Sequence, residues 1–352
     1  MIFDYIKKYG KYTFFEEEFN EVDNVIFSSL SYIEILDNIN CKLENLYELI
    51  FIGNYKKKFN SSISEVKTAL QILYLCAKEN RYRDVSIMNV EKVIDKTTQF
   101  QVTSFLLEDS LVYASFSGTN HLLSGWEEDF NMTYSYPLKA QMLAQKYLEK
   151  NYSKTNYDLI IGGHSKGGNL AVTSTFKIND ELNKRIKRVY SNDGLGLMVQ
   201  QYTSNEYKRV QDRVVSIIPD YSLVGLLLHN DNRIIIKTSK KIISSHNPSS
   251  WKVEDNHFVR TNLSKFSLVF EKTFHMWLDK YNEEEKKKFT TEIFDIFRKL
   301  NIESLIDIKL KKKYLLKMIM ESKNVDILVK IMVKDFIKTY KNNYTSYSRE
   351  VS

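Results

Sequence analysis

The feature that most constrains the fold of this chain is the segment of residues 157–178. It begins with a short apolar run, Tyr157-Asp-Leu-Ile-Ile161, passes through Gly162 and Gly163, and continues into a stretch with helical spacing from about Ser165 to Ile178. A buried strand, a tight glycine turn and a helix form the unit from which parallel sheets are built. The segment therefore predicts an α/β fold.

Further strands are expected on both sides of this unit. The pattern of residues 99–107, a polar Glu108-Asp109-Ser110 turn and residues 111–116 predicts a β-hairpin. A helix should follow Pro137, and residues 188–192, 213–218 and 233–237 are three more short apolar strands separated by connecting segments. Strands that alternate with helices favour a mainly parallel sheet that is covered on both faces.

The two ends of the chain are expected to be helical. Between Phe15 and Ala77 the apolar residues recur at helical spacing, as in Val22, Val25 and Ile26. Beyond about Asn262 glycine and proline vanish, and residues 266–281, 286–300 and 325–340 again show helical spacing. We therefore predict a domain of residues 1–260, including the helical N-terminal segment, and a helical C-terminal segment of residues 261–352.

Composition excludes several classes of protein. With 43% hydrophobic and 27% charged residues in 352, the chain is neither disordered nor collagen-like. Its 2 cysteines, Cys41 and Cys76, lack the spacing of a zinc site or a disulfide framework. The N-terminus has no signal-peptide pattern and no window is apolar enough to span a membrane, so we expect a cytoplasmic protein.

The strongest chemical signal is Gly162-Gly-His-Ser-Lys-Gly-Gly168, which contains G-x-S-x-G at Gly163, Ser165 and Gly167. A serine on a sharp strand-to-helix turn exposes its hydroxyl at the start of the helix, and the flanking glycines give that turn room. Ser165 is therefore predicted to be a nucleophile, with the backbone N–H of Lys166 facing the oxyanion. The alternative is a glycine-rich turn that cradles phosphate, but the G-x-x-x-x-G-K-[ST] pattern is missing.

A serine hydroxyl needs a histidine base that is held by a carboxylate. In α/β-hydrolase sheets both partners follow the nucleophile along the chain. His246 lies in a polar loop after the last predicted strand and is the preferred base, with His257 as the alternative. Asp220 follows the strand that precedes this loop and is the preferred acid, with Asp193 as the alternative.

A family resemblance is visible at these residues. Phe116-Ser-Gly-Thr119, Trp126-Glu-Glu-Asp129 and Gly163-His-Ser-Lys-Gly-Gly168 resemble the F-R-G-[ST], W-x-x-D and G-H-S-x-G-G signatures of fungal-type class 3 lipases. Together with Phe19-Asn-Glu-Val-Asp23 and Ser245-His-Asn-Pro-Ser-Ser-Trp251, they look like a bacterial branch of lipase-like proteins without assigned function. The resemblance spans roughly residues 15 to 260 and implies an α/β-hydrolase fold.

The resemblance also implies roles. Ser165 would be the nucleophile, Asp220 the acid and His246 the base, while Thr119 and the Lys166 amide would form the oxyanion hole. Asp129 would hold the Thr119 hydroxyl, and His164, which lies within the turn itself, is expected beside the catalytic residues without being one of them. Three positions depart from the pattern: Ser117 replaces an arginine, Lys166 an apolar residue, and Leu195 a proline.

Two segments remain open to two interpretations each. Residues 120–128 have the mixed character of a lipase lid, or Leu122, Leu123 and Trp126 simply pack on the sheet. The side chain of Lys166, next to the predicted nucleophile, has two interpretations as well. It either favours an anionic substrate or extends into solvent.

The net charge of +7 lies entirely in residues 260–352, which contain 20 Lys or Arg and 13 Asp or Glu. Within them, residues 309–320 resemble a basic amphipathic helix at a lipid surface, although a solvated helix is the commoner explanation of such a segment. We therefore consider a peripheral contact with an anionic membrane, and we expect no nucleic-acid partner.

We expect a serine hydrolase that cleaves a carboxylic ester, of a lipid or another apolar acyl compound, through an acyl-enzyme. No cofactor and no metal are implied. The alternatives are an acyltransferase that uses the same triad and a binding or scaffold protein that keeps the fold without turnover.

Overall fold

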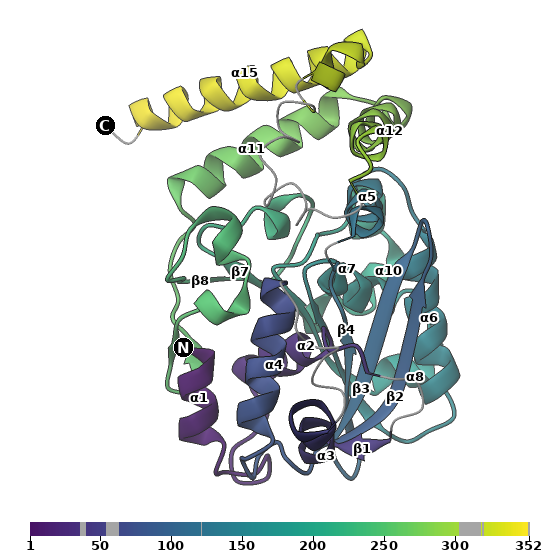
Figure 1. Cartoon of the computed structure of the whole chain (residues 1–352), viewed down its shortest axis with the longest axis vertical. Coiled ribbons are helices and arrows are strands. Elements are labelled where there is room, and N and C mark those ends of the chain that lie inside the picture. The colour runs from purple at the N-terminus through teal and green to yellow at the C-terminus, as the bar shows by residue number, and fades with distance from the viewer. Residues whose placement is uncertain (36–39, 54–62, 121, 303–317, 319, 351–352) are drawn as a thin grey trace.

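The computed structural model describes residues 1–35, 40–53, 63–120, 122–302, 318 and 320–350, and an eight-stranded sheet runs through its centre (Figure 1). The order of the strands in space is their order in the chain. They are β1 (Cys41–Lys42), β2 (Ser86–Ile94), β3 (Gln99–Glu108), β4 (Leu111–Phe116), β5 (Asp158–His164), β6 (Ile186–Asn192), β7 (Val214–Pro219) and β8 (Arg233–Ile236). A separate two-stranded hairpin contains β9 (Val253–Glu254) and β10 (His257–Phe258).

The sheet is antiparallel at its beginning and parallel in the rest. Strands β1 to β4 pair antiparallel with their neighbours, and β4 to β8 pair parallel. The hairpin predicted for residues 99–116 is β3 and β4. Strand β2 was not predicted, because most of its side chains are half-buried and its sequence does not alternate clearly. The prediction of an α/β-hydrolase fold with a mainly parallel central sheet is confirmed.

Three groups of helices surround the sheet. The N-terminal group contains α1 (Ile2–Tyr9), α2 (Glu21–Leu30), α3 (Leu43–Tyr47), the π-helical turn η1 (Glu48–Ile52) and α4 (Ser64–Cys76). The middle group contains α5 (Leu123–Asn131), α6 (Lys139–Tyr152), α7 (Lys166–Thr173), α8 (Asp180–Lys184), α9 (Val199–Tyr202), α10 (Asn205–Lys208) and the 3-10 turns η3 (Gln211–Arg213), η4 (Val224–Leu226), η5 (Ile242–Ser245) and η6 (Pro248–Ser250). The C-terminal group contains α11 (Lys265–Lys280), α12 (Glu283–Lys299), η7 (Ser322–Asn324) and α15 (Ile327–Glu350).

Each face of the sheet has its own core, because successive side chains of a strand point to opposite faces. Tyr113 and Ile160 pack with the N-terminal helices α1, α2 and α4. Their neighbours Val112 and Leu159 pack with α6 and α7 on the other face. The helical N-terminal segment thus covers one face of the sheet and is part of the fold.

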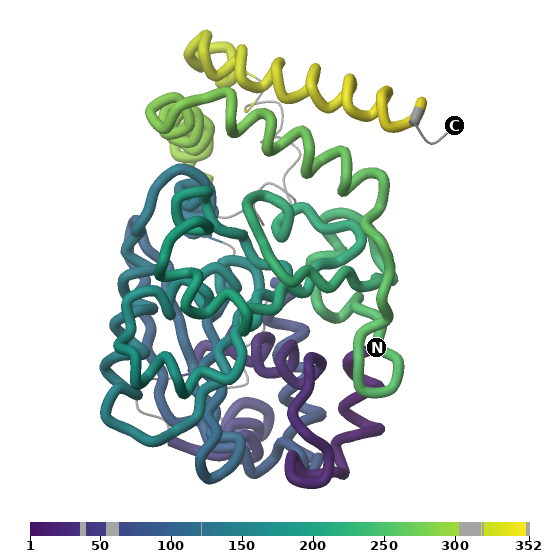
Figure 2. Tube along the Cα trace, turned by 180° about the vertical axis from the view of Figure 1, so that it is seen from behind, coloured from purple at the N-terminus to yellow at the C-terminus, as the bar shows by residue number. Residues whose placement is uncertain are grey.

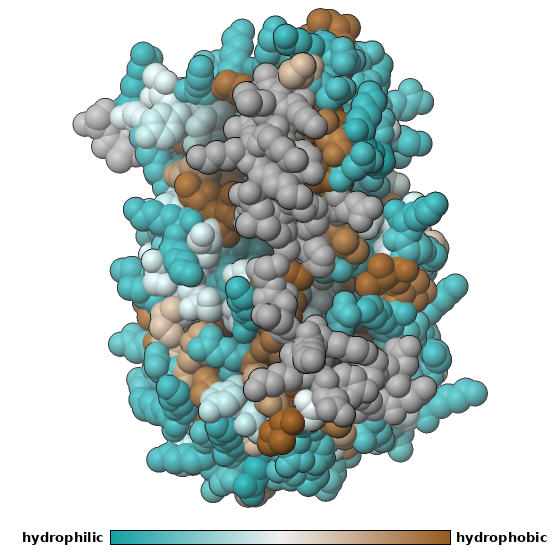
Figure 3. All heavy atoms as spheres, in the orientation of Figure 1, coloured by the Kyte–Doolittle hydropathy of each residue, from teal (hydrophilic) through white to brown (hydrophobic). Residues whose placement is uncertain are grey.

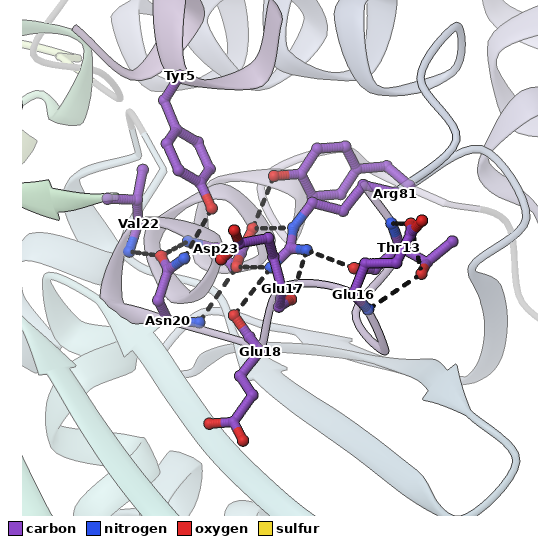
Figure 4. Close-up of polar contacts among 10 residues, drawn as sticks. Tyr5, Thr13, Glu16, Glu17, Glu18, Asn20, Val22, Asp23 and Arg81 are labelled. Carbon is purple, nitrogen blue, oxygen red and sulfur yellow. Dashed lines mark hydrogen bonds and ion pairs between the residues drawn. The ribbon is translucent and has the colours of Figure 1, made fainter. Parts of the chain in front are cut away.

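The motif Phe19-Asn-Glu-Val-Asp23 anchors this N-terminal cover. Asn20 and Asp23 form a capping box at the start of α2. The Asp23 carboxylate also receives two hydrogen bonds from Arg81, at 2.6 and 3.0 Å, and both side chains are fully buried (Figure 4). Arg81 donates further to the carbonyls of Thr13, Glu17 and Glu18. The motif therefore has a structural role in the described chain.

The C-terminal helices lie together at one end of the molecule, above the end of the sheet where α5 and η4 are found (Figures 1 and 2). The described part of residues 261–352 is helical, as predicted, while the division into two domains at residue 260 stays a prediction. Of the basic stretch 309–320, only Met318 and Met320 belong to the described residues, so a membrane contact there also stays a prediction. None of the described helices is long and apolar enough to cross a bilayer.

Candidate active site

Ser165 lies at the turn between β5 and α7, in a backbone conformation with φ of 60° and ψ of −130°. Such a positive φ is uncommon for a residue with a Cβ and is costly unless the surroundings enforce it. The glycines around it permit the turn, since a Cβ on Gly163 would lie 2.2 Å from the Gly167 carbonyl oxygen. Strain at this point presents the Ser165 side chain at the N-terminus of α7.

His246 lies after η5, in the loop that follows β8. Its Nδ1 is 2.6 Å from Oδ2 of Asp193, and its backbone carbonyl oxygen is 2.8 Å from Nε2 of His164, the residue before Ser165. The rings of His164 and His246 are 4.4 Å apart between centroids. His246 is therefore held both by a carboxylate and by the turn that carries Ser165.

The carboxylate that contacts His246 belongs to Asp193, so the preference for Asp220 is corrected. Asp220 Oδ1 instead accepts hydrogen bonds from the backbone N–H and the hydroxyl of Thr238, at 3.2 and 2.6 Å, and connects the ends of β7 and β8. Asp193 follows β6, the strand beside β5, and its φ of 44° turns the carboxylate toward His246. The left-handed backbone of the Asp-Gly turn is the physical reason for this geometry.

Asp193 is itself held firmly. Its Oδ1 accepts hydrogen bonds from the Ser222 hydroxyl and from the Gly225 N–H, the latter at 3.1 Å. The preceding residue, Asn192, exchanges hydrogen bonds with Asn24 on α2, at 2.7 and 3.1 Å. The helix α2 thus holds the residue that precedes Asp193.

The Asp193 contact sets the protonation behaviour of His246. Burial alone would lower the pKa of the imidazole, but the charge of Asp193 and its hydrogen bond outweigh burial and raise that pKa. Because Nδ1 is hydrogen-bonded to Asp193, Nε2 is the nitrogen that remains for proton transfer. The other candidate base, His257, lies exposed on β10.

His164 is a neutral structural partner of this site. Burial lowers its pKa well below the usual value, and the nearby His246 contributes in the same direction. A carbonyl oxygen can only accept, so Nε2 of His164 donates to His246, and Nδ1 accepts the hydroxyl of Tyr32 at 2.8 Å. Tyr32 was not predicted, because no motif marks a tyrosine on the distant N-terminal segment.

The residues predicted for the oxyanion hole lie around the same turn. The Thr119 hydroxyl is 2.6 Å from Oδ2 of Asp129, the contact that the resemblance implied. Lys166 is the first residue of α7, and the first N–H groups of a helix have no partner within it. Its amide is therefore available beside Ser165.

The side chain of Lys166 agrees with neither predicted interpretation, because it is fully buried. Its Nζ lies 3.1 Å from Oε2 of Glu128 and 4.0 Å from Oδ1 of Asp129. Burial raises the pKa of Asp129 to about 7, although the charge of Lys166 opposes this shift. Lys166 thus balances one charge of a buried carboxylate pair, and Glu128 is a member of the site that the sequence did not reveal.

Residues 123–131 form the helix α5, which packs under the C-terminal helix α12. Arg298 of α12 pairs with Glu127 at 2.7 Å, and the rings of Phe130 and Phe294 are 5.8 Å apart. Trp126 lines a cavity and packs against the cluster of Leu123, Phe294 and Ile302. Of the suggested lid, His121 lies outside the described residues.

A cavity of about 360 Å³ lies next to Ser165. Its described lining is apolar except for Ser165, Asp129 and Thr133. The other residues are Trp126, Phe130, Leu195, Val224 and Leu227 from the α/β body, and Phe270, Phe274, Trp277, Phe289, Met332, Val333, Phe336 and Ile337 from the C-terminal helices. Among the described residues, no group of three or more His, Cys, Asp or Glu side chains is placed to hold a metal ion.

Comparisons with known proteins give two similarities. The chain is similar to the solved structure described as M37 lipase, with 14% identity and a TM-score of 0.37, over 59% of this chain and 70% of that one. No curated protein sequence matches. Residues 76–295 match the Mbeg1-like family model, and because this match spans more than half of the chain, the protein belongs to the Mbeg1-like family.

Proposed function

We propose that this protein is a carboxylic ester hydrolase in which Ser165 is the nucleophile, His246 the base and Asp193 the acid. The observation that carries the proposal is the hydrogen bond between Asp193 and His246 in a loop held against a strained serine turn. A serine at a strained turn and a carboxylate-bound histidine are the parts that activate a hydroxyl for acyl transfer, and the contact of His246 with His164 brings the histidine loop to the serine turn.

In the first half-reaction, Ser165 Oγ attacks the ester carbonyl carbon while Nε2 of His246 takes the hydroxyl proton. The electron pair of the carbonyl bond moves to its oxygen, which becomes the oxyanion. The backbone N–H groups of Lys166 and Thr119 would stabilise this charge. Asp193 stabilises the imidazolium and fixes its orientation.

The tetrahedral intermediate then collapses. The carbonyl re-forms, the bond from the carbonyl carbon to the alcohol oxygen breaks, and His246 gives its proton to that oxygen. An acyl-Ser165 ester remains. Water repeats the sequence, losing a proton to His246 as it attacks, and Ser165 leaves with that proton, so the products are an alcohol and a carboxylic acid.

Asp129 would orient Thr119 during these steps. When Asp129 is ionised, it accepts the Thr119 hydroxyl, and the backbone N–H of Thr119 serves the oxyanion. When Asp129 is protonated, its own O–H can donate to Thr119 Oγ1, which frees the threonine hydroxyl for the oxyanion. In both states the threonine keeps one rotamer, which is what a preorganised oxyanion hole requires.

The test is covalent labelling of the full chain by a fluorophosphonate, together with hydrolysis of p-nitrophenyl butyrate. The wild type should be labelled and active, and Ser165→Ala should lose both. Ser174→Ala is the matched control and should keep both, because the hydroxyl of this buried serine donates to the carbonyl of Ala171 three residues earlier in the chain. A wild type that is not labelled, or a Ser165→Ala variant that is labelled equally, would overturn the proposal and leave a scaffold protein.

A further inference from the structure

The cavity beside Ser165 is built from two parts of the chain that are distant in sequence. Half of its described lining residues come from α11, α12 and α15, and most of the rest come from the loops and α5 of the α/β body. The C-terminal helices therefore complete a cavity that starts at the nucleophile.

The helix α11 is fastened to the site by specific hydrogen bonds. The Ser267 hydroxyl donates to the carbonyl oxygen of Ser222 at 3.0 Å, and Ser222 is the residue whose hydroxyl holds Asp193. Nε2 of His275 lies 3.1 Å from the carbonyl oxygen of Leu226. The wall of the cavity and the acid of the site thus share one support.

The helix α15 is fastened to α11 in turn. Nε1 of Trp277 donates to the carbonyl oxygen of Met332 at 2.9 Å, and Asn343 donates to the buried Thr273 hydroxyl at 3.0 Å. Aromatic contacts join the two helices, such as Phe270 to Phe336 at 6.3 Å between centroids. The pair α11–α15 is a packed wall with defined side-chain positions.

The chemistry of the wall selects one kind of occupant. Apolar and aromatic side chains line the cavity almost everywhere away from Ser165 and Asp129. Ser165 lines the cavity, so the carbonyl that it attacks must lie there. An ester has an acyl group and an alkoxy group on that carbon, and only the acyl group stays bonded to the serine in the acyl-enzyme, so the acyl chain is the group that needs a lasting site in the protein. Burial of an apolar group there is favourable, and a charged group would lose its hydration without compensation.

We infer that α11 and α15 form the distal wall of an acyl-chain site, and that these C-terminal helices set the length of acyl chain that the enzyme accepts. The inference rests on the proposed function for its position relative to Ser165. A cavity of about 150 Å³ is known to hold benzene, so about 360 Å³ corresponds to a chain of roughly ten to fourteen carbons. The expected substrates are esters of unbranched fatty acids of that length.

Two residues of α15 offer a way to shorten the site without disturbing the core. Val333 and Ile337 line the cavity, yet they are 39% and 48% exposed, so the surface beside them has room for a larger side chain. Hydrophobic residues also reach the molecular surface in the upper half of the view in Figure 3, at the level of these helices. Ile331, 45% exposed on the same helix, does not line the cavity and provides a matched control.

The experiment measures kcat/KM for p-nitrophenyl esters of two to sixteen carbons with the full chain. In the wild type each added methylene should raise kcat/KM about two- to fourfold up to roughly a dozen carbons, after which it should fall. Val333→Trp and Ile337→Trp should lower kcat/KM for the twelve-carbon ester at least tenfold relative to kcat/KM for the two-carbon ester of the same variant, and shift the optimum by two to four carbons. Ile331→Trp should keep the wild-type profile.

A length profile that is the same in all four proteins would overturn the acyl-wall inference while leaving the hydrolase in place. A second measurement does not need turnover: calorimetric binding of dodecanoate to Ser165→Ala. Dodecanoate should bind this protein and bind at least tenfold more weakly when Val333→Trp or Ile337→Trp is added. Absence of binding, or equal affinities, would overturn the inference. If dodecanoate binds to Ser165→Ala but the wild type hydrolyses none of the esters, the acyl site is upheld and the proposed function is rejected.

Discussion

Oδ2 of Asp193 lies 2.6 Å from Nδ1 of His246, although 53 residues separate them in the chain. The contact joins the end of β6 to the loop after β8, across the strand β7. Of the two aspartates at strand ends, Asp193 is therefore the one that can orient the imidazole of His246.

Asp193→Asn should lower kcat by about 10⁴-fold, because an amide in this position stabilises the wrong imidazole tautomer. Asp220→Asn should cost less than about tenfold, since an amide oxygen can still accept the Thr238 hydrogen bonds. The measurement is kcat for p-nitrophenyl butyrate with both variants at equal folded concentration. A larger loss in Asp220→Asn would return the acid to the end of β7.

The pH dependence of labelling should report the same contact. A general base must be neutral, so the rate of fluorophosphonate labelling should rise with pH through the pKa of His246, at a midpoint above the ordinary 6.5 because Asp193 raises that pKa. In Asp193→Asn the charge is lost and burial remains, so the midpoint should move to lower pH. Asp129, whose pKa is raised to about 7, also titrates here, and Asp129→Asn removes its contribution. A midpoint that is unchanged in Asp193→Asn would contradict the assignment.

The buried pair of Lys166 and Glu128 should show strong coupling. Lys166→Met leaves the Glu128 carboxylate buried without its cation, which should cost about 3–5 kcal/mol of unfolding free energy. Adding Glu128→Gln removes that charge and should recover a large part of the loss. Urea denaturation of the single and double variants gives the coupling energy. Lys184→Met, at an exposed pair with Glu181, is the control and should leave the free energy of unfolding almost unchanged, because water screens an exposed ion pair. Additive losses in the cycle would show that the two charges do not interact.

The Asp23–Arg81 pair should determine whether the N-terminal helices stay on the sheet. Arg81→Met leaves the buried Asp23 carboxylate without its cation and removes the hydrogen bonds that Arg81 donates to three backbone carbonyls, so a loss of about 3–5 kcal/mol is expected. Arg83→Met, two residues away at an exposed pair with Asp84, should cost less than about 1 kcal/mol. Chemical denaturation of both variants tests this. Equal stabilities would mean that the capping box and the apolar core hold α2 without the pair.

Much of the fold was determined by local sequence patterns. The order of strand, glycine turn and helix at residues 157–178 predicted the unit of β5 and α7, because glycines are needed where Gly163 and Gly167 pass each other. The hairpin of β3 and β4 and the helices at both ends were predicted from the spacing of apolar residues. A strand or helix that buries one face needs apolar residues at a regular spacing, and this spacing is visible in the sequence. The bond between Thr119 and Asp129 followed from a resemblance carried by short motifs.

Only the tertiary structure shows that Asp193, and not Asp220, contacts His246, because both follow parallel strands and sequence does not give the direction of a carboxylate at the end of a strand. Asp193 has a left-handed backbone conformation with φ of 44°, and Asp220 accepts a hydrogen bond from the Thr238 hydroxyl instead of contacting His246. The burial of Lys166 was equally hidden, since a lysine's sequence context does not show that a carboxylate 38 residues earlier lies beside it. The apolar wall of α11 and α15 could not be predicted either. The sequence shows that each helix has an apolar face, but it does not show which part of the protein that face packs against. Long-range packing brings these residues to the cavity that Ser165 lines.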